Sequence, residues 1–163
     1  MNNPSYRIRP LRPDETSLLR NFLYEAIYLP QGVEVPPRSI VDLPELRIYI
    51  EVFGIQHGDY CLVAEVCGQV VGASWVRLMD DYGHVDDQTP SLAISLLPSY
   101  RGRGIGTALL RSLFCLLSAQ GFGHVSLSVQ KTNPAVRLYR RLGFYTVRET
   151  EEEYIMLCRL QSS

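Results

Sequence analysis

The period of the apolar positions changes several times along the first sixty residues, and each change predicts a new element. Alternation over residues 6–10 predicts a short strand with one buried face. Apolar residues that recur every three or four positions from Leu18 to Ile27 predict a helix that ends near Leu29-Pro30. Residues 31–44 contain one glycine and three prolines, which predicts a long loop of a kind that is often functional. A second helix is expected from about Pro44 to Phe53.

The remaining chain alternates strands with helices. Two β-rich runs, residues 60–66 and 70–78, flank the glycine-bearing segment 67–69 and predict an antiparallel hairpin. Further strands are expected at residues 91–97, 125–129, 144–148 and 154–160, and further helices over about 17 residues from Gly104 and from Pro134 to Leu142. The sequence has no internal repeat, low-complexity tract or linker, so we expect a single α+β domain over residues 1–163.

Composition and charge narrow the class of protein. The 163 residues are 46% hydrophobic and 20% charged, which is typical of a folded globular chain. Sixteen Lys and Arg against 17 Asp and Glu give a net charge of −1, so we expect no nucleic-acid partner. No apolar run approaches the ~18 residues of a membrane span, and no apolar stretch follows the arginines of residues 7–12. We therefore expect a cytoplasmic protein without a membrane partner.

The cysteines and histidines follow no pattern of metal ligation. Cys61, Cys67, Cys115 and Cys158 form no C-x-x-C pair and lie in apolar segments, so we expect reduced, buried thiols. His84 and Asp86 form an H-x-D pair, but the other histidines lie far away in sequence. We therefore expect no metal.

A strand, a glycine-rich turn and a long helix follow one another between Leu92 and Thr107. N–H groups at a helix start have no intrahelical partner and lie at the positive end of the helix dipole, so they bind anions such as phosphate. Glycines at 102, 104 and 106 allow close approach of a ligand to the main chain. Their spacing matches neither G-x-G-x-x-G nor a loop ending in G-K-[ST], which disfavours dinucleotide and P-loop sites; another type of nucleotide binder stays a weak alternative.

Two motifs carry a family resemblance. The segment Arg101-Gly-Arg-Gly104-Ile-Gly106 resembles the R-x-x-G-x-G acyl-CoA signature of the GNAT superfamily of N-acyltransferases. Downstream, Asn133-Pro-Ala135 followed by Tyr139 and Gly143-Phe144 resembles the N-x-A-x-x-x-Y-x-x-x-G-F segment of the same family, in the family's order. The resemblance implies a mixed, mostly antiparallel central sheet flanked by helices. It also implies acetyl-CoA as co-substrate.

The resemblance further implies how acetyl-CoA lies and reacts. Main-chain amides would hold the pyrophosphate at Arg101, Gly102, Arg103, Gly104, Ile105, Gly106 and Thr107. The pantetheine arm would run beside Leu96 and Leu97, in a slot between that strand and residues 125–129, with Asn133 both capping a helix and contacting the cofactor. A backbone N–H near Leu96 would stabilise the oxyanion, and Tyr139 would protonate the leaving thiolate. The expected reaction is direct acetyl transfer, in a ternary complex, to a primary amine of a small molecule or peptide.

The general base is where the sequence departs from the commoner family pattern, because residues 91–97 contain no acid. Candidates acting through water are Asp80, Asp81, His84, Asp86, Asp87 and Glu25. Glu149 and Glu151 to Glu153 could, with the aspartates, attract a cationic amine, or could be a solvated turn. The missing strand acid leaves one alternative, a catalytically weak acyl-CoA-binding or sensing module. The resemblance also allows a homodimer through the last two strands.

Overall fold

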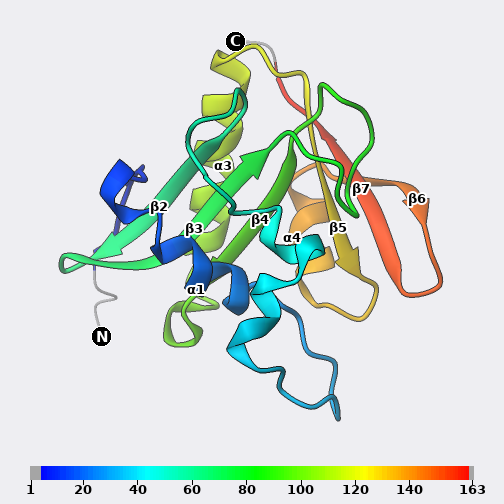
Figure 1. Ribbon diagram of the computed structural model, residues 1–163. Helices are drawn as coiled ribbons and strands as arrows, with labels where there is room; N and C mark the ends of the chain where they lie inside the picture. Colours follow the sequence, from blue (N-terminus) through cyan, green and yellow to red (C-terminus); the bar gives the residue numbers. More distant parts are fainter. Residues whose placement is uncertain (1–4, 162–163) are drawn as a thin grey trace.

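A seven-stranded sheet with the order β1-β2-β3-β4-β5-β7-β6 organises the computed structural model, which describes residues 5–161 (Figure 1). The strands are β1 (Arg7–Pro10), β2 (Tyr60–Val66), β3 (Gln69–Arg77), β4 (Ser91–Leu96), β5 (His124–Gln130), β6 (Tyr145–Glu149) and β7 (Glu153–Arg159). The helices are α1 (Leu18–Glu25), α2 (Pro44–Arg47), α3 (Ile105–Ala119) and α4 (Ala135–Arg141), with the 3-10 turns η1 (Pro13–Glu15), η2 (Arg38–Asp42) and η3 (Pro98–Tyr100). In the described range no helix is long and apolar enough to span a membrane.

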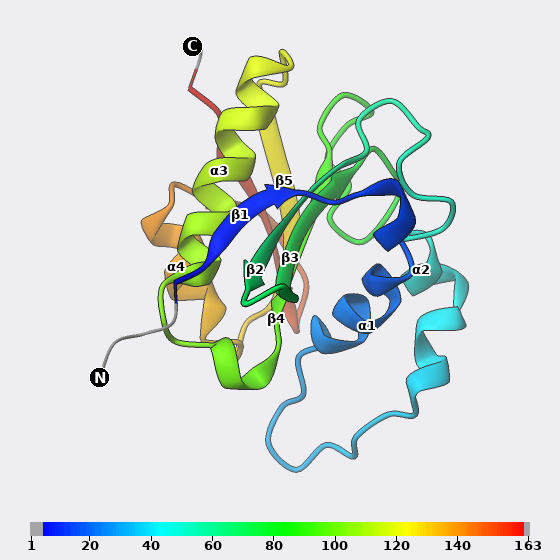
Figure 2. The same cartoon turned by 90° about the vertical axis from the view of Figure 1, so that its left-hand side faces the viewer.

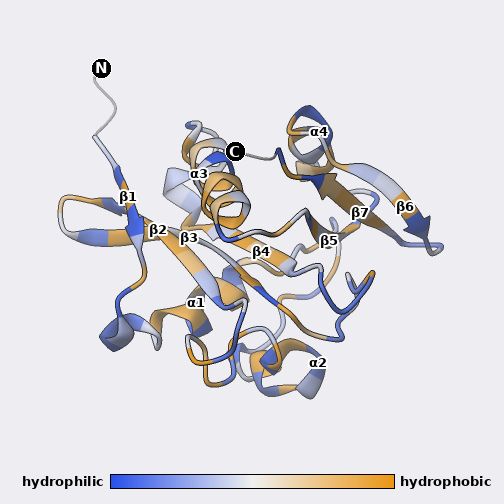
Figure 3. Cartoon of the chain, turned by 90° about the horizontal axis from the view of Figure 1, so that it is seen from above, coloured by the Kyte–Doolittle hydropathy of each residue, from blue (hydrophilic) through white to orange (hydrophobic). Residues whose placement is uncertain are grey.

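Two hydrophobic layers cover the two faces of the sheet. Helices α3 and α4 lie on one face, and α1 and α2 lie on the other (Figures 2 and 3). Leu109, Leu113 and Leu117 recur at helical spacing along α3 and are fully buried, as the apolar stripe predicts. The opposite layer is built around Trp75, which α1 covers with Phe22. Both faces of the central strands are therefore buried.

The sheet is mixed but mostly antiparallel, which confirms the expected fold class. Every neighbouring pair of described strands is antiparallel except β4 and β5. Those two parallel strands are in register at a single position, Ser91 with Ser126. Beyond that pair β4 and β5 diverge, so the ladder of backbone hydrogen bonds between these two central strands is interrupted.

The first half of the chain differs from expectation in its helices. Helix α1 ends at Glu25 rather than near Pro30. Phe22 O still accepts the N–H of Ala26 at 2.9 Å, but Glu25 O, which a longer helix would use internally, accepts Arg101 Nη2 at 3.3 Å. The expected loop contains the 3-10 turn η2, and α2 is a single turn that ends at Arg47 rather than Phe53.

The buried side chain of Arg77 explains why α2 stops early. Its guanidinium donates to the carbonyls of Ile48, Glu51 and Val52 at 2.6–3.2 Å, and Val52 itself has a positive φ of 49°. Arg77 also forms a two-pronged ion pair with Asp59, at 3.0 and 2.9 Å, that is almost completely shielded from solvent. Long-range side-chain contacts thus shape residues 48–59, which helical periodicity could not foresee.

The expectation of four buried thiols is half wrong. Cys61 and Cys158 are buried, whereas Cys67 and Cys115 are exposed, and all four are free. Cys67 occupies the hairpin turn between β2 and β3 with a φ of 50°. Cys115 lies on the outer side of α3, because the helix rotates it away from the sheet while its neighbours on the leucine stripe face inward.

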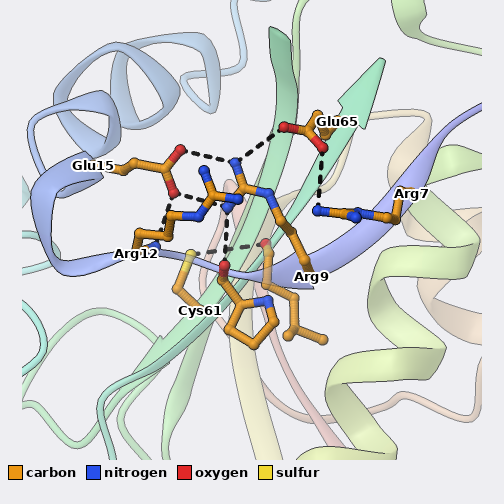
Figure 4. A network of polar contacts seen from close by, with 8 residues as sticks. Arg7, Arg9, Arg12, Glu15, Cys61 and Glu65 are labelled. Carbon is orange, nitrogen blue, oxygen red and sulfur yellow. Dashed lines mark hydrogen bonds and ion pairs between the residues drawn. The ribbon is translucent and has the colours of Figure 1, made fainter. Parts of the chain in front are cut away.

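Ion pairs fasten β1 to the rest of the molecule (Figure 4). Arg9 donates through both terminal nitrogens to Glu15 at 2.8 Å, and it approaches Glu65 of β2 at 3.5 Å. Glu15 in turn accepts the Arg12 N–H at 2.9 Å. The Arg9 hydrogen bond is the main cause that lowers the pKa of Glu15 to about 2.

Candidate active site

The glycine-rich turn before α3 has the geometry of an anion site. Gly102 and Gly104 have φ values of 74° and 84°, in the left-handed region that side-chain-bearing residues rarely adopt. The first N–H bonded within the helix is that of Ala108, which donates to Gly104 O at 3.2 Å. The N–H groups at positions 105–107 are therefore free of intrahelical partners at the positive end of a 15-residue helix.

Gly106 differs from the two other glycines, because the protein structure itself does not require a glycine at this position. It lacks a positive φ, and a Cβ built on it would meet Leu96 Cδ1 at 3.6 Å, an ordinary van der Waals contact. The protein alone would accept alanine there. A glycine in the first turn of the helix lets a ligand come close to the main chain. The shape of the turn is therefore compatible with a bound pyrophosphate.

The two arginines of the turn have different contacts. Arg101 bends back toward the sheet, where Nε donates to Leu96 O at 3.0 Å and Nη2 pairs with Glu25 Oε2 at 3.2 Å. Arg103 is exposed, and its guanidinium lies 5.7 Å from the centre of the Tyr100 ring. Arg101 therefore fastens the turn to β4 and α1, and Glu25, one of the candidate bases, is engaged in that ion pair.

The open edge of β4 leads from this turn into the sheet. Leu97 N donates to Val71 O at 2.8 Å, on the β3 side. Because the polar groups of a strand alternate between its two edges, the N–H and C=O groups of Ile94 and Leu96 point toward β5. Since the strands have separated there, β5 offers them no ladder partner in the described chain. Arg101 Nε occupies the Leu96 carbonyl, so the N–H and C=O groups of Ile94 and the N–H of Leu96 are left to bind an extended ligand.

A cavity of about 260 Å³ lies where β4 and β5 separate. Its lining includes Leu127 and Val129, which belong to the core on the α3 side, together with Ser128 and Gln130, which face the other side of the sheet. Residues of both faces of the sheet therefore border the cavity. Hollows of about 420 and 560 Å³ also exist, but they adjoin neither the glycine turn nor the separated strands.

Tyr139 of α4 lines this cavity from the α3 side. Its ring packs edge-to-face on Phe144 at 5.7 Å. Burial raises the pKa of Tyr139 to about 12, so the phenol stays protonated at neutral pH and is available as a proton donor. Asn133 also lines the cavity, and its Oδ1 accepts the N–H of Ala135 at 2.9 Å. The structure thus gives Asn133 its expected capping contact and brings it together with Tyr139.

The loop acids that were candidate bases do not line this cavity. Asp80 and Asp87 have side chains 92% and 98% exposed and lie beside His84. Asp86 accepts the Gln88 N–H at 2.8 Å and borders the 420 Å³ hollow. Asp81 is closest to the cavity, but its oxygens already accept hydrogen bonds from Tyr49 and, at 2.6 Å, from Ser91.

Sequence reasoning did not single out several residues that shape the other end of the cavity. Tyr49 lines it, and its carbonyl accepts the Trp75 Nε1–H at 3.1 Å. Burial, followed by the charge of Asp81, raises the pKa of Tyr49. Glu153, first residue of β7, lines the cavity as well. Of these residues, the sequence indicated only Glu153, as part of a glutamate run that could attract a cationic amine.

Comparison with known proteins agrees with this geometry. The family model of the "Acetyltransferase (GNAT) domain" matches residues 57–146, more than half of the chain. An N-alpha-acetyltransferase of Sulfurisphaera tokodaii is 35% identical over 114 residues, which cover 60% of this chain and 68% of that relative. The chain belongs to the GNAT acetyltransferase family. Two further curated acetyltransferases are matched over only 57% and 60% of their lengths.

Solved structures show the same fold. The ribosomal-protein-S18-alanine N-acetyltransferase of Escherichia coli superposes with a TM-score of 0.67 at 18% identity, covering 98% of this chain and 96% of that one. A GNAT family acetyltransferase of Brucella melitensis in complex with acetyl-CoA gives a TM-score of 0.62 at 23% identity, covering 99% and 92%. The match over nearly the whole chain confirms the expected fold class.

Proposed function

We propose that the protein is an acetyl-CoA-dependent N-acetyltransferase that acts on a primary amine of a small molecule or peptide. The observation that carries the proposal is the cavity between the separated strands β4 and β5, which Ile94 of β4 and Tyr139 of α4 both line. Family membership supports the same reaction. Such a cavity allows the two substrates to approach one another from opposite faces of the sheet.

Main-chain groups would hold the acyl donor. The free N–H groups at positions 105–107, with the main chain of residues 101–104, suit a pyrophosphate. The N–H and C=O groups of Ile94, which have no partner on β5, suit the pantetheine amides, and the arm would continue past Leu96, where the strand ends, and the adjoining Leu97. Acetyl-CoA supplies an activated thioester carbonyl. The Leu96 N–H is the donor for the negative charge that develops on its oxygen.

Tyr139 is the proposed proton donor to the departing thiolate. A tyrosine is already protonated at neutral pH, and burial, which raises the pKa of Tyr139 to about 12, keeps the phenol protonated well into the alkaline range. Its aromatic packing on Phe144 restricts the ring, which favours a fixed donor position. Asn133, bonded to the Ala135 N–H, would hold the start of α4 and so the position of Tyr139.

Direct attack by the amine fits the site better than a covalent enzyme intermediate. None of the four cysteines is among the described residues that line the cavity, and Cys115 lies on the outer side of α3. The amine must therefore attack the thioester carbonyl itself, with both substrates bound together. The C–N bond forms and the C–S bond breaks as Tyr139 protonates the sulfur; solvent water takes up the protons that the amine loses, and one of them restores the Tyr139 phenol.

The test combines two measurements on one sample: calorimetric binding of acetyl-CoA and release of free thiol with a panel of primary amines. Micromolar binding and amine-dependent thiol release are expected. Binding without turnover on a broad panel would instead support the acyl-CoA-sensing module. Absence of binding would overturn the assignment of the glycine turn.

A further inference from the structure

Glu153 is the one charged residue among the described residues that line the cavity. The remainder of the lining is aliphatic, aromatic or uncharged polar, and it includes the rings of Tyr28, Tyr49 and Tyr82. No lysine, arginine or histidine of residues 5–161 contributes to it. A half-buried carboxylate in the wall of a cavity that has no cationic side chain attracts a cation from solution.

The position of Glu153 in the sheet directs its side chain toward the amine side of the cavity. Glu153 of β7 lies directly opposite Gln130 of β5, so the two side chains share a face of the sheet. That face is the one opposite Val129, and therefore opposite the α3 layer and Tyr139. The charge of Glu153 is also one of the smaller causes that raise the pKa of Tyr49, which places the carboxylate near that phenol.

The carboxylate of Glu153 has no protein partner in the described chain, unlike three other acids near the cavity. Glu149 pairs with Lys131 at 2.6 Å, and Glu25 pairs with Arg101. Asp81 is occupied by Tyr49 and Ser91. The main-chain N–H of Glu153 donates to the Thr150 hydroxyl, and its C=O accepts the Thr150 N–H. Its side chain is half-buried. It is the carboxylate left free to receive a cation from outside the protein.

We propose that Glu153 receives the ammonium group of the acceptor, and that the cavity selects cationic amines with an apolar or aromatic body and no neighbouring carboxylate. This inference rests on the proposed acetyl transfer and names the substrate class for it. The ammonium neutralises Glu153 in surroundings of low polarity, where the attraction is stronger than in water. The rings of Tyr28 and Tyr82 add apolar contact and cation–π attraction.

The same lining disfavours α-amino acids. Their carboxylate would be brought close to Glu153 in a cavity whose described lining offers no cationic side chain. An unpaired charge buried against a like charge is an effective way to reject a competing ligand. Phenethylamine and phenylalanine differ only by this carboxylate, so they form a matched pair of probes.

The experiment compares wild type, Glu153→Gln and Glu151→Gln, which removes the same charge at an exposed neighbour. Thiol release gives kcat and KM for each probe, and calorimetry gives phenethylamine affinity for the protein saturated with CoA. For wild type we expect kcat/KM to be at least ten-fold higher with phenethylamine than with phenylalanine. Glu153→Gln should weaken phenethylamine binding and raise its KM about ten-fold, with the KM of acetyl-CoA unchanged, whereas Glu151→Gln should match wild type.

The outcomes separate this inference from the proposed function. Equal behaviour of the two variants, or phenylalanine used as well as phenethylamine, would overturn the role of Glu153 while acetyl transfer stands. Binding of phenethylamine that depends on Glu153, without turnover of any amine, would support the inference and overturn acetyl transfer. If phenethylamine neither binds nor reacts, the role of Glu153 is refuted. Equal melting temperatures of the three proteins exclude misfolding as the cause of any loss.

Discussion

Residues 91–143 and residues 7–59 are organised by different kinds of interaction. The first region, from β4 through α4, is built by main-chain geometry: a glycine turn, a free helix start and two strands that diverge. The second region, from β1 to the start of β2, contains only short helices. Side chains from distant parts of the sequence hold it in place, as Arg77 does with Asp59 and with three backbone carbonyls.

This difference has a consequence for function. A main-chain site for a constant ligand needs few particular side chains, because every residue supplies an N–H and a C=O group. The other region borders the amine end of the cavity, through Leu46 and Tyr49. Arg101 joins the glycine turn to Glu25 at the end of α1, whereas Leu46 and Tyr49 lie beside a different segment, which Arg77 holds. That segment can therefore change with the acceptor while the donor site stays the same.

The largest effect is expected from Arg77→Leu. The substitution leaves Asp59 as a buried, unpaired carboxylate and three carbonyls without a donor, which costs about 3–5 kcal/mol of the free energy of unfolding. For a chain of this size the melting temperature should fall by roughly 6–20 °C. Calorimetric melting measures it, with Arg20→Leu, which breaks the exposed pair with Asp42, as the control. Similar shifts in the two variants would mean that the second region does not depend on its buried pair.

Gly104→Asp tests the main-chain region. Aspartate at a φ of 84° is strained, and its charge lies where the helix start would bind an anion, so acetyl-CoA affinity should fall more than 100-fold, or about 3 kcal/mol. Gly121→Asp is the matched control, because Gly121 has a φ of 90° at the other end of α3. Both variants should lose similar thermal stability. Isothermal titration should show lost affinity in Gly104→Asp alone, and equal affinities would contradict the turn's role.

The two regions also differ in how far the sequence predicts them. The glycine turn, α3, α4 and the hairpin of β2 and β3 follow from local signals, since glycine spacing and helical periodicity are read within a few residues. The extents of α1 and α2 do not, because the side chains that bond the carbonyls where they end, Arg101 and Arg77, come from distant parts of the sequence. Helical periodicity is read within one segment, so it cannot reveal a hydrogen-bond donor that comes from a distant part of the sequence.

The site divides in the same way. Tyr139 and Asn133 could be named from a motif, and the structure brings them to one cavity. Glu153 could be noticed only as part of an acidic run, because its register opposite Gln130 decides which face it occupies. Tyr49 had no signal at all, since its position depends on the Trp75 hydrogen bond. Side chains at the amine end therefore require the three-dimensional structure.

Tyr139→Phe is expected to lower kcat about 10–100-fold, which corresponds to about 1.4–2.8 kcal/mol, with acetyl-CoA affinity changed less than two-fold. The phenyl ring keeps the packing on Phe144 and removes only the proton donor. Steady-state kinetics and calorimetry measure the two quantities. Tyr145→Phe, an exposed tyrosine on β6, should be unaffected in both. Parallel losses of kcat and of acetyl-CoA affinity in Tyr139→Phe would show that the hydroxyl binds the donor rather than protonating the leaving group.

The smallest effect concerns the ion pair that fastens β1. Removing the charge in Glu15→Gln should cost about 1 kcal/mol at pH 7, because the pair with Arg9 is only partly shielded from solvent. Folding lowers the pKa of Glu15 to about 2 from an ordinary 4.5, so its stabilisation is fully present above pH 4.5. It is lost progressively as the pH falls from about 4.5 to about 2.

Melting temperatures of wild type and Glu15→Gln, measured from pH 7 to pH 2, test this dependence. The difference between the two proteins should be constant above pH 5 and should shrink below pH 4.5, as wild type takes up the proton that the variant cannot bind. Asp14→Asn, at the exposed neighbouring position, should show no such convergence. A difference that stays constant down to pH 2 would mean that shape and not charge holds β1, and that the second region depends less on ion pairs than its contacts indicate.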